Sequence, residues 1–446
     1  MGNKNTITYI KKNMCENSMM TRYVYTFLLY LLLPLTPLKL LWRARKQPEY
    51  LQHWRERYGF YPPANHHLAS KPVIWLHCVS VGETRAAEPL IKALLIQHPN
   101  HRILLSHTTP TGRTTSEQLF GDTSFKNSVQ RVYLPYDAPF AAARFLKHFK
   151  PSVGVLMETE LWFNLIAGCK QQAIPLLLVN ARLSEKSAWG YAKLGLLVHE
   201  GLQNLSNIAA QTQQDAARLK SLGAKNIQVV GNLKFDVMPP DDALAQGQQL
   251  RTLFGAHRPV FLAASTREDE ETLVLDAVID AQIANLLTVI VPRHPQRFNE
   301  VEALLQGLGL KYVKRSSLNK KVEAETQFIL GDSMGELFTY YASADISLVG
   351  GSLLPYGGQN LIEAMRMGKP VLIGEHTFNF KEISELAVKQ GAAWRISDRA
   401  SLSLALQTLV ENPQKQLEMG NKGLALCATS KGATQQTLTL IAQHLR

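Results

Sequence analysis

From Pro72 onward, short apolar runs alternate with longer amphipathic stretches. Apolar strands that alternate with helices build a parallel sheet, because each helix returns the chain to the same end of the sheet and covers one of its faces. The pattern therefore predicts an α/β protein. The chain has 446 residues, more than one hydrophobic core usually supports, so two domains are expected.

The expected strands form two series, separated by a change in composition. Residues 236–258, with Met238-Pro-Pro-Asp-Asp242 near their start, are typical of a linker. We expect two doubly wound, Rossmann-like domains that face a cleft, over 72–235 and 259–446, with a closing helix at 434–446. The expected strands are 73–79, 102–107, 132–134, 153–157, 176–180, 208–210 and 227–230, then 260–264, 287–291, 328–330, 346–349, 371–373 and 393–396.

Charge and cysteine content narrow the function classes. There are 48 Lys and Arg against 36 Asp and Glu, a net charge of +12, which favours anionic partners. No nucleic-acid-binding module is recognisable, so an anionic membrane or a phosphorylated substrate is favoured over nucleic acid. The four cysteines form no C-x-x-C pair, and no H-E-x-x-H stretch occurs, so neither a disulfide framework nor a metal site is expected. Without a G-x-G-x-x-G fingerprint, a nicotinamide dehydrogenase is disfavoured.

The amino-terminal part has membrane character. Residues 23–38 carry no charge, and as a helix they extend about 24 Å, short of the ~30 Å hydrocarbon core. No A-x-A-like cleavage site follows, and flanking bases argue against a buried core helix. We expect a polar extension over 1–22, a membrane anchor over 23–42 and a basic membrane-proximal segment over 43–71. A spanning helix and one lying in a single leaflet both remain open, and the bases predict that the body stays cytoplasmic.

Glu83 stands at the mouth of the first expected strand. It follows the strand 73–79 and the turn Ser80-Val-Gly-Glu83, and a helix-like stretch comes next. Open parallel sheets bind ligands at the carboxyl ends of their strands. Gly82 is expected to let the backbone turn sharply and approach a ligand. The alternative is that Glu83 is only a first-turn acid that the helix dipole favours.

Three further strand ends carry polar groups in the same expected domain. Strand 153–157 runs into Glu158 and Glu160, which alternation places on roughly the same side, although both can simply cap the next helix. Lys234 follows the strand 227–230, where a lysine is usually a solvated loop cation. The loop Thr108-Thr-Pro-Thr-Gly112 offers hydroxyls to a polyol or a phosphate. Together they place acids, a lysine and hydroxyl donors on one rim.

The second expected domain has the marks of a nucleotide binder. Its densest signal is Gly350-Gly-Ser-Leu-Leu-Pro-Tyr-Gly357-Gly-Gln-Asn-Leu-Ile-Glu363, a glycine-rich crossover from strand to helix. Glycines admit close backbone approach, and helix N–H groups bind phosphate; the alternative is glycines that serve strand–helix packing. Arg293 and Arg297 add guanidinium groups at another strand end, and Gly331-Asp-Ser-Met-Gly335 forms a third loop.

Taken in order, these segments resemble the bacterial 3-deoxy-D-manno-octulosonic acid (Kdo) transferases of lipopolysaccharide core synthesis. The resemblance covers nearly everything from Tyr23 onward, with two departures: Phe163 stands where proline is common and Gln359 where histidine is common. The matching segments are Trp54-Arg-Glu-Arg-Tyr-Gly59, Ser80-Val-Gly-Glu83, Tyr133-Leu-Pro-Tyr-Asp137, Met157-Glu-Thr-Glu-Leu-Trp162, Asn180-Ala-Arg182-Leu-Ser184, Gly231-Asn-Leu-Lys234-Phe, Pro292-Arg-His-Pro295, 331–337 and 357–363.

The resemblance implies a GT-B type glycosyltransferase at the cytoplasmic face of the bacterial inner membrane. Such enzymes move Kdo from CMP-Kdo to the lipid A precursor lipid IVA, with no metal or other cofactor. Glu83 matches the general base, and Glu158 and Lys234 match a pair that stabilises the transition state. The implied donor contacts are Arg293, His294, Ser333, Met334, Gly335, Asn360, Leu361, Ile362 and Glu363. Further candidate substrate contacts are Ser80, Gly82, Thr109, Gly112, Glu160, Gly351, Gly357 and Gly358.

The residues fit this chemistry on their own terms. A sugar hydroxyl is a poor nucleophile and needs a base within reach of its proton. Guanidinium and helix N–H groups can stabilise the departing phosphate, and one base with direct displacement predicts inversion. Two alternatives remain: a nucleotide-sugar epimerase of the same architecture, which needs no anchor, and a membrane-tethered nucleotide sensor, which needs no acids on the rim.

Overall fold

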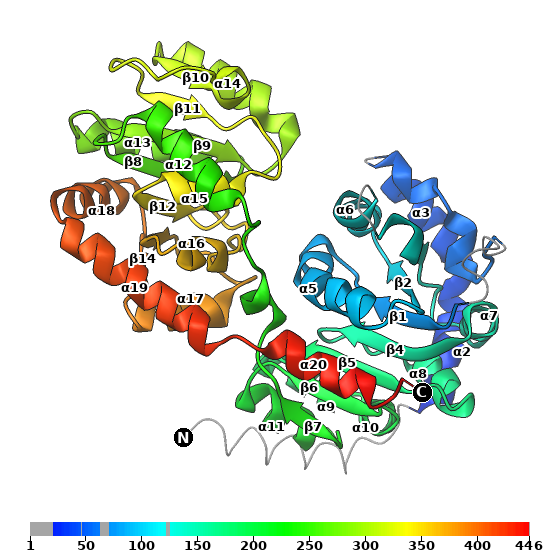
Figure 1. Ribbon diagram of the computed structural model, residues 1–446. Helices are drawn as coiled ribbons and strands as arrows, with labels where there is room; N and C mark the ends of the chain where they lie inside the picture. The colour runs from blue at the N-terminus through cyan, green and yellow to red at the C-terminus, as the bar shows by residue number, and fades with distance from the viewer. Residues whose placement is uncertain (1–20, 46, 63–70, 122–124, 446) are drawn as a thin grey trace. The chain divides into compact units, whose positions relative to one another are not determined.

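The computed structural model describes residues 21–45, 47–62, 71–121 and 125–445 (Figure 1). The expected polar extension over 1–22 lies almost wholly outside the described residues. The chain forms two compact units. The first comprises the chain up to Val237 together with Lys431–Arg446, and the second is Met238–Ser430.

The first unit is built on a seven-stranded parallel sheet in the order β3-β2-β1-β4-β5-β6-β7. Strands β2 and β3 are added on one side of β1, and β4 to β7 on the other. The carboxyl ends of β1 and β4 therefore flank the switch point, where the order of strands reverses. The strands are β1 Val73–His77, β2 Arg102–His107, β3 Val129–Tyr133, β4 Pro151–Met157, β5 Leu176–Ala181, β6 Asn207–Ala210 and β7 Ile227–Val229. The helices among them are α5 Val81–Gln97, α6 Pro110–Phe120, α7 Pro139–Phe149, α8 Phe163–Gln171, α9 Glu185–Ala192, α10 Leu196–Gln203 and α11 Gln213–Ser221, with the 3₁₀ turn η5 Leu233–Asp236.

Both faces of this sheet are covered, because its central strands β1 and β4 are mostly apolar and almost wholly buried. All residues of β1 are buried, and the two faces carry separate hydrophobic clusters, one around Trp75 and one around Ile74. Gly154 of β4 lies under the Trp75 ring, and a Cβ there would stand 2.7 Å from it. The absence of a side chain at Gly154 therefore lets the indole pack flat on the neighbouring strand.

The second unit repeats the architecture with a seven-stranded parallel sheet in the order β10-β11-β9-β8-β12-β13-β14. Its switch point lies between β8 and β12. The strands are β8 Val260–Thr266, β9 Leu287–Pro292, β10 Tyr312–Lys314, β11 Phe328–Leu330, β12 Ile346–Val349, β13 Val371–Ile373 and β14 Ala393–Arg395. The helices are α12 Ala243–Phe254, α13 Glu270–Ala281, α14 Phe298–Gly307, α15 Leu337–Ser343, α16 Ile362–Arg366, α17 Lys381–Lys389, α18 Arg399–Glu411 and α19 Pro413–Thr429.

Two expected boundaries differ from the structure. The proposed linker 236–258 contains a full helix, α12, whose Gly247 lies against Ala342 of α15 so closely that a Cβ would stand 2.2 Å away. The closing helix, α20 Ala433–Ala442, belongs to the first unit and not to the domain 259–446. Asp236 fixes its start by accepting the backbone N–H groups of Gly432 at 2.9 Å and Thr434 at 2.6 Å.

The expected anchor is a nearly continuous helical run, Arg22–Ala44, made of α2 Arg22–Leu32, the 3₁₀ turn η1 Leu33–Leu35 and α3 Thr36–Ala44. By length and composition the run suffices to cross a membrane, which by itself is weak evidence for a span. Pro34 lies in the 3₁₀ turn, as expected for a residue without an N–H. One stripe of the run is less exposed and faces the first unit, at Tyr25, Thr26, Leu29, Leu33, Thr36 and Leu40.

Candidate active site

Glu83 lies in the first turn of α5, directly after β1 at the switch point of the first unit. One carboxylate oxygen accepts the Val79 N–H at 2.8 Å, and the other accepts the Ser80 hydroxyl at 2.9 Å. Ser80 in turn caps the helix by accepting the Glu83 N–H at 3.3 Å. The carboxylate is thus held in one orientation at the carboxyl end of β1. Glu83 is also an acidic residue in the first turn of a helix, as the alternative interpretation expected.

The environment of Glu83 favours its protonated form. Burial is the largest cause and, with the charges of Glu158 and Glu160, raises the pKa of Glu83 to about 7, although the hydrogen bonds from Val79 and Ser80 act in the opposite direction. A base whose pKa lies near neutrality suits proton abstraction at physiological pH, because it is available as carboxylate and still binds a proton well.

Glu158 and Lys234, which follow different strands of this sheet, form an ion pair. Glu158 follows β4, and its carboxylate lies 3.7 Å from the Lys234 ammonium. Burial lowers the pKa of Lys234, whereas the charge of Glu158 raises it and that of Arg182 lowers it. Glu158 also adopts a left-handed backbone conformation with φ of 58°, which non-glycine residues rarely take and which occurs often at functional sites.

We call residues 158–162 the acidic turn. Within it, the Trp162 indole donates to the Glu160 carboxylate at 2.9 Å, and the Thr159 hydroxyl donates to the Arg182 carbonyl. Burial raises the pKa of Glu160, and the hydrogen bond from Trp162 lowers it. Glu160 therefore belongs to the same electrostatic cluster as Glu83, as the strand-end positions predicted, and it caps no helix through its side chain.

Thr109 and Gly112 lie next to the Glu83 turn. The Thr109 hydroxyl donates to the Val79 carbonyl at 2.8 Å and accepts the Gly112 N–H at 3.2 Å. A Cβ at Gly112 would stand 3.0 Å from the Val79 carbonyl, so the absence of a side chain permits this close approach. At Gly82 the expected glycine-specific turn is absent, because its φ is not left-handed and a Cβ would have room; its contact with a substrate stays a prediction.

Two further polar residues of this site, Asn180 and Arg182, entered the sequence interpretation only as part of the family resemblance, without a role of their own. Asn180 is the penultimate residue of β5, with φ of 52°, and its amide oxygen accepts the Leu233 N–H at 3.0 Å, which holds the turn that carries Lys234. Arg182 supplies positive charge close enough to affect Lys234. The strand-end position of Asn180-Ala-Arg182, the same signal that selected Glu158, indicated both residues.

In the second unit, Arg293 and the glycine-rich loop come together at the sheet's carboxyl edge. Arg293 follows β9, and its Nε donates to the Gln359 side chain at 3.1 Å. Gln359, one of the two departures from the family pattern, therefore orients the guanidinium. His294 follows Arg293, and its pKa is lowered mainly by burial.

A buried carboxylate that the sequence interpretation overlooked organises this loop. Glu270, fully buried at the start of α13, accepts the N–H groups of Arg267 at 2.9 Å, Gly351 at 2.5 Å and Leu353 at 2.9 Å. The acid therefore holds the ends of β8 and β12 at a fixed separation. Its position at the first residue of the helix that follows the apolar strand β8 was the available signal.

The glycines of this loop serve both backbone conformation and packing. Gly351, Gly357 and Gly358 adopt left-handed φ values of 67°, 92° and 76°, which a side chain would strain. Gly350 instead packs against β8, where a Cβ would stand 2.6 Å from the Ser265 carbonyl. The packing alternative is therefore correct for Gly350, while the other three shape the loop.

The remaining donor candidates differ in what they offer a ligand. Asn360 donates to the Glu363 carboxylate at 3.1 Å, and both residues are half-buried, whereas Leu361 and Ile362 are fully buried and offer only backbone groups.

The third loop of the second unit follows β11. The Ser333 hydroxyl contacts Glu336 and lies 2.6 Å from the Tyr340 hydroxyl, Met334 is half exposed, and Gly335 turns the loop with φ of 84°. The Ser333 hydroxyl is thus engaged by side chains of the same unit, whereas a Cβ at Gly335 would meet nothing within 4 Å.

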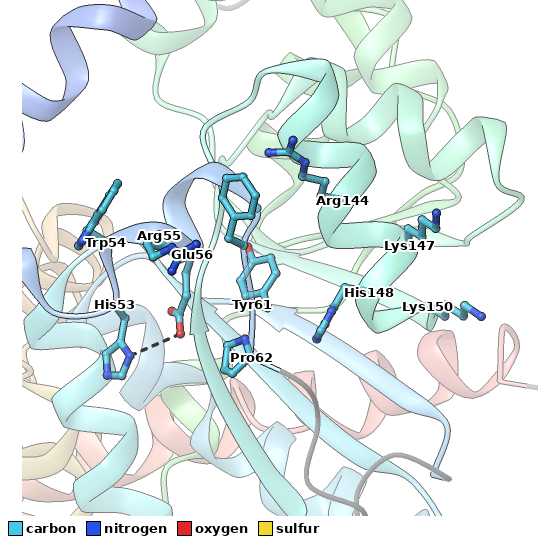
Figure 2. Close-up of a pocket in the computed structure, with 12 residues that line it drawn as sticks. His53, Trp54, Arg55, Glu56, Tyr61, Pro62, Arg144, Lys147, His148 and Lys150 are labelled. Atoms are coloured by element: carbon cyan, nitrogen blue, oxygen red, sulfur yellow. Dashed lines mark ion pairs between the residues drawn. The ribbon is translucent and has the colours of Figure 1, made fainter.

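A separate cavity of about 970 Å³ lies on the first unit between α7 and the 3₁₀ turn η3 Trp54–Tyr58 (Figure 2). It contains none of the acids described above. Glu56 is its acid, and it is paired with Arg113 at 2.7 Å. The lining cations Arg55, Arg144, Lys147 and Lys150 form no ion pair among the described residues. Across the described ranges, no group of three or more His, Cys, Asp or Glu is arranged to hold a metal ion.

Residues 52–237 match the family model described as "3-Deoxy-D-manno-octulosonic-acid transferase (kdotransferase)", and residues 273–425 match "Glycosyl transferases group 1". The 3-deoxy-D-manno-octulosonic acid transferase of Bordetella pertussis is 42% identical over 96% of this chain and 100% of its own length. The chain belongs to this transferase family. The Haemophilus influenzae member is 37% identical over 96% of this chain and 99% of its own.

The chain is thus a glycosyltransferase of GT-B architecture. A solved structure described as a putative UDP-N-acetylglucosamine 2-epimerase from Listeria monocytogenes has a TM-score of 0.54, covering 84% of this chain and 97% of its own, at 14% identity. Identity at that level shows a shared fold alone. The epimerase alternative is therefore not favoured, since the family matches run through the segments that hold Glu83, Glu158 and Lys234.

Proposed function

We propose that this enzyme transfers Kdo from CMP-Kdo to the lipid A precursor lipid IVA, with inversion at the anomeric carbon and without a metal ion. The observation that carries the proposal is Glu83, a buried carboxylate at the switch point of the first unit whose pKa of about 7 suits a general base. Family membership supplies the substrate class, because the relatives are named for this sugar.

The proposed step is a direct displacement. The acceptor hydroxyl oxygen attacks the anomeric carbon of Kdo while Glu83 takes the hydroxyl proton, and the bond to the CMP phosphate oxygen breaks with its electron pair leaving on CMP. Lys234, paired with Glu158, supplies positive charge near the reacting groups. Arg293, oriented by Gln359, and the loops 333–335 and 357–363 hold the nucleotide.

We infer that the enzyme attaches to the cytoplasmic face of the inner membrane through α2 and α3, which lie along the first unit. Tyr25, Thr26 and Thr36 each form a hydrogen bond with this unit, to Asp137, Asn164 and Tyr58 respectively, and these contacts favour a helix lying in the interface plane over a free span. Phe27 and Leu38, on the other side, are 69% and 63% exposed.

The cavity between α7 and η3, which we call the basic cavity, favours anionic lipid as a further partner. Arg55, Arg144, Lys147 and Lys150 line it, and their positive charge favours acidic headgroups. Replacing these four residues by Gln is expected to weaken binding to phosphatidylglycerol vesicles more than binding to phosphatidylcholine vesicles. The matched control replaces Lys311, Lys320, Lys321 and Lys389, exposed cations of the second unit, by Gln. Equal losses of vesicle binding in both variants would show that net charge, and not the cavity, accounts for the effect.

The decisive experiment incubates the full-length protein with CMP-Kdo and lipid IVA and examines the lipid by mass spectrometry. A gain in lipid mass that equals one or more Kdo residues supports transfer, and its persistence in excess EDTA supports metal independence. CMP is expected to inhibit better than UMP or UDP. Strict dependence of activity on magnesium or manganese would refute the metal-free mechanism. Unmodified lipid IVA would refute the proposal that lipid IVA is the acceptor.

A further inference from the structure

The first turn of α8 is capped by a carboxylate from a distant part of the chain. Its own N-cap residue, Trp162, supplies no side-chain cap. Asp137, which precedes α7, instead accepts the N–H of Asn164 at 3.0 Å and that of Leu165 at 2.8 Å. The Asn164 amide donates back to the Asp137 carbonyl at 2.7 Å. Asp137 therefore fixes the start of the helix that directly follows the acidic turn.

The amino-terminal helix completes this cap. The Tyr25 hydroxyl of α2 donates to the Asp137 carboxylate at 2.9 Å, and the Thr26 hydroxyl donates to the Asn164 amide oxygen at 3.0 Å. The Tyr25 ring also meets Phe163 edge-on, with ring centroids 5.3 Å apart. Asp137 is 4% exposed. The helix expected to be an anchor thus contributes the third hydrogen bond to a buried carboxylate of the catalytic unit.

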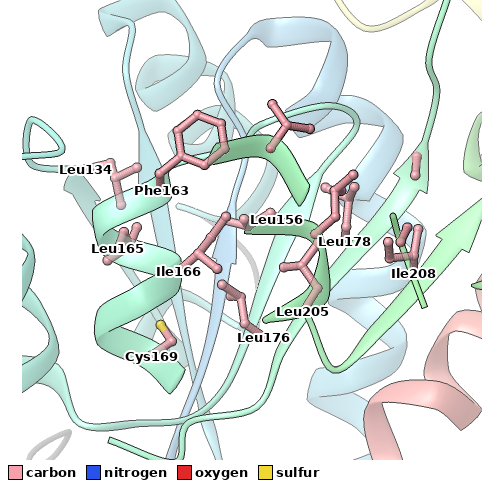
Figure 3. Packing of buried hydrophobic residues seen from close by; sticks show 14 of the residues in the cluster. Leu134, Leu156, Phe163, Leu165, Ile166, Cys169, Leu176, Leu178, Leu205 and Ile208 are labelled. Atoms are coloured by element: carbon pink, nitrogen blue, oxygen red, sulfur yellow. The ribbon is translucent and has the colours of Figure 1, made fainter. Parts of the chain in front are cut away.

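The start of α8 is fixed on its inner side as well. Phe163, Leu165 and Ile166 are buried in the core of the first unit (Figure 3). On the other side, Trp162 donates to Glu160 at 2.9 Å and meets the buried His77 ring edge-on. A displacement of the first turn of α8 therefore moves Trp162, and with it Glu160.

We propose that Asp137 and Tyr25 are positioning residues that fasten α2 to the start of α8 and so hold the acidic turn in place for transfer. The inference rests on the proposed function of that turn. It makes α2 a part of the catalytic unit, in addition to any role in membrane attachment.

The ionised form of Asp137 is the better acceptor for these hydrogen bonds, since protonation turns one of its two oxygens into a donor and both oxygens face donors. Burial, the largest cause, raises the pKa of Asp137 to about 6, against the N–H groups of Asn164 and Leu165 and the Tyr25 hydroxyl, which lower it. Loss of the Tyr25 hydroxyl therefore raises this pKa further. The groups that face the carboxylate are Arg22 and Tyr25 from α2, and Asn164, Leu165 and Cys169 from α8.

The test compares two matched variants of the full-length protein, Tyr25→Phe and Tyr30→Phe. Both remove one hydroxyl from α2, but the Tyr30 ring stacks on Phe140 and its hydroxyl forms no hydrogen bond among the described residues. Tyr25→Phe is expected to lower kcat about 5- to 30-fold, because it removes a hydrogen bond to a charged group. The KM for CMP-Kdo and sedimentation with membranes should stay within about twofold of wild type.

The pH profile provides a readout that a purely structural role would not change. In wild type, log kcat/KM is expected to fall below about pH 7 as Glu83 is protonated, and to fall more steeply below about pH 6 as Asp137 follows. In Tyr25→Phe the steeper part begins at higher pH, and Tyr30→Phe keeps the wild-type profile. Asp137→Asn should lower kcat at least as strongly as Tyr25→Phe does. If the Asp137→Asn protein does not fold, the result for Tyr25→Phe alone tests the inference.

Each outcome has a distinct meaning. A Tyr25→Phe protein with the kcat and pH profile of Tyr30→Phe would overturn the inference. Loss of activity that accompanies release from the membrane would also overturn it, because α2 would then act only as an anchor. If wild-type protein does not modify lipid IVA, the proposed function fails before any variant is compared.

Discussion

At the residue scale, the Glu83 carboxylate is fixed by hydrogen bonds at the start of α5, and its pKa is nevertheless raised. The Val79 N–H and the Ser80 hydroxyl hold the carboxylate and stabilise its charge, yet burial and two neighbouring acids outweigh them, so the pKa rises to about 7. Rigid placement and a pKa near neutrality are together what a general base requires.

The first prediction concerns Glu83 itself. Glu83→Gln is expected to lower turnover by about 100- to 10,000-fold, because an amide cannot take the acceptor proton. CMP affinity and the thermal melt should be close to wild type, since the amide fits the same space. Glu88→Gln is the matched control on α5, where Glu88 forms a surface pair with Lys92 at 2.8 Å. A folded Glu83→Gln protein with nearly full activity would move the role of base to Glu158 or Glu160.

A second prediction uses the causes of the raised Glu83 pKa. The Ser80 hydroxyl lowers that pKa and the Glu160 charge raises it. Ser80→Ala should therefore move the acid limb of the kcat/KM profile to higher pH, and Glu160→Gln should move it to lower pH, each by about 0.5–1 unit. The opposite signs are the check, because a general loss of stability would not shift the two profiles in opposite directions.

Strand-end placement predicted much of the first-unit site, because it depends only on local pattern. Glu83, Glu158 and Lys234 each follow an apolar run, and parallel strands bring their ends together. The supporting residues were harder to find because their partners are distant in sequence: Asn180 contacts a residue 53 positions away, and Glu270 contacts one 81 positions away. No local pattern specifies such pairs.

At the scale of elements, buried apolar strands were predicted closely, whereas a short strand flanked by charged residues was missed. β12 and β13 have the predicted bounds, and every residue in them is buried. β10, Tyr312–Lys314, was missed because none of its three residues is buried and charged residues flank it. The location of α20 was also missed, since helix-like periodicity does not show which unit a helix packs against.

The third prediction tests the contact between the central strands β1 and β4, which carry Glu83 and Glu158 at their ends. Gly154→Ala should cost about 1–3 kcal/mol in unfolding free energy, because its Cβ would stand 2.6 Å from Leu176 and 2.7 Å from the Trp75 ring. Gly190→Ala in α9 is the control: its Cβ would meet nothing within 4 Å, so a gain of about 0.5–1 kcal/mol is expected. Denaturant unfolding followed by tryptophan fluorescence measures both, and equal effects would contradict the packing argument.

At the scale of the whole molecule, the candidate residues divide between the two units. The acids and Lys234 lie at the switch point of the first unit, and Arg293 with the glycine-rich loop lies at the carboxyl edge of the second. The helical run Arg22–Ala44 and the basic cavity also belong to the first unit. This division suits a reaction in which one substrate is a membrane lipid and the other a soluble nucleotide sugar.

The final prediction tests the exposed side of that helical run. Phe27, Leu31 and Leu38 are 69%, 66% and 63% exposed, so replacing all three by Gln should leave the fold and the Tyr25–Asp137 contact intact. Because burial of apolar surface in lipid provides much of the binding free energy, the variant should shift from the membrane fraction to the supernatant.

The matched control makes the same change on the second unit, where Leu404, Leu417 and Leu424 are 60%, 58% and 43% exposed. That variant should stay with the membrane, because these leucines lie outside the helical run. If both triple variants sediment like wild type, apolar contact through α2 and α3 does not hold the enzyme on the bilayer. Attachment would then depend on the basic cavity, and high salt alone should release the protein.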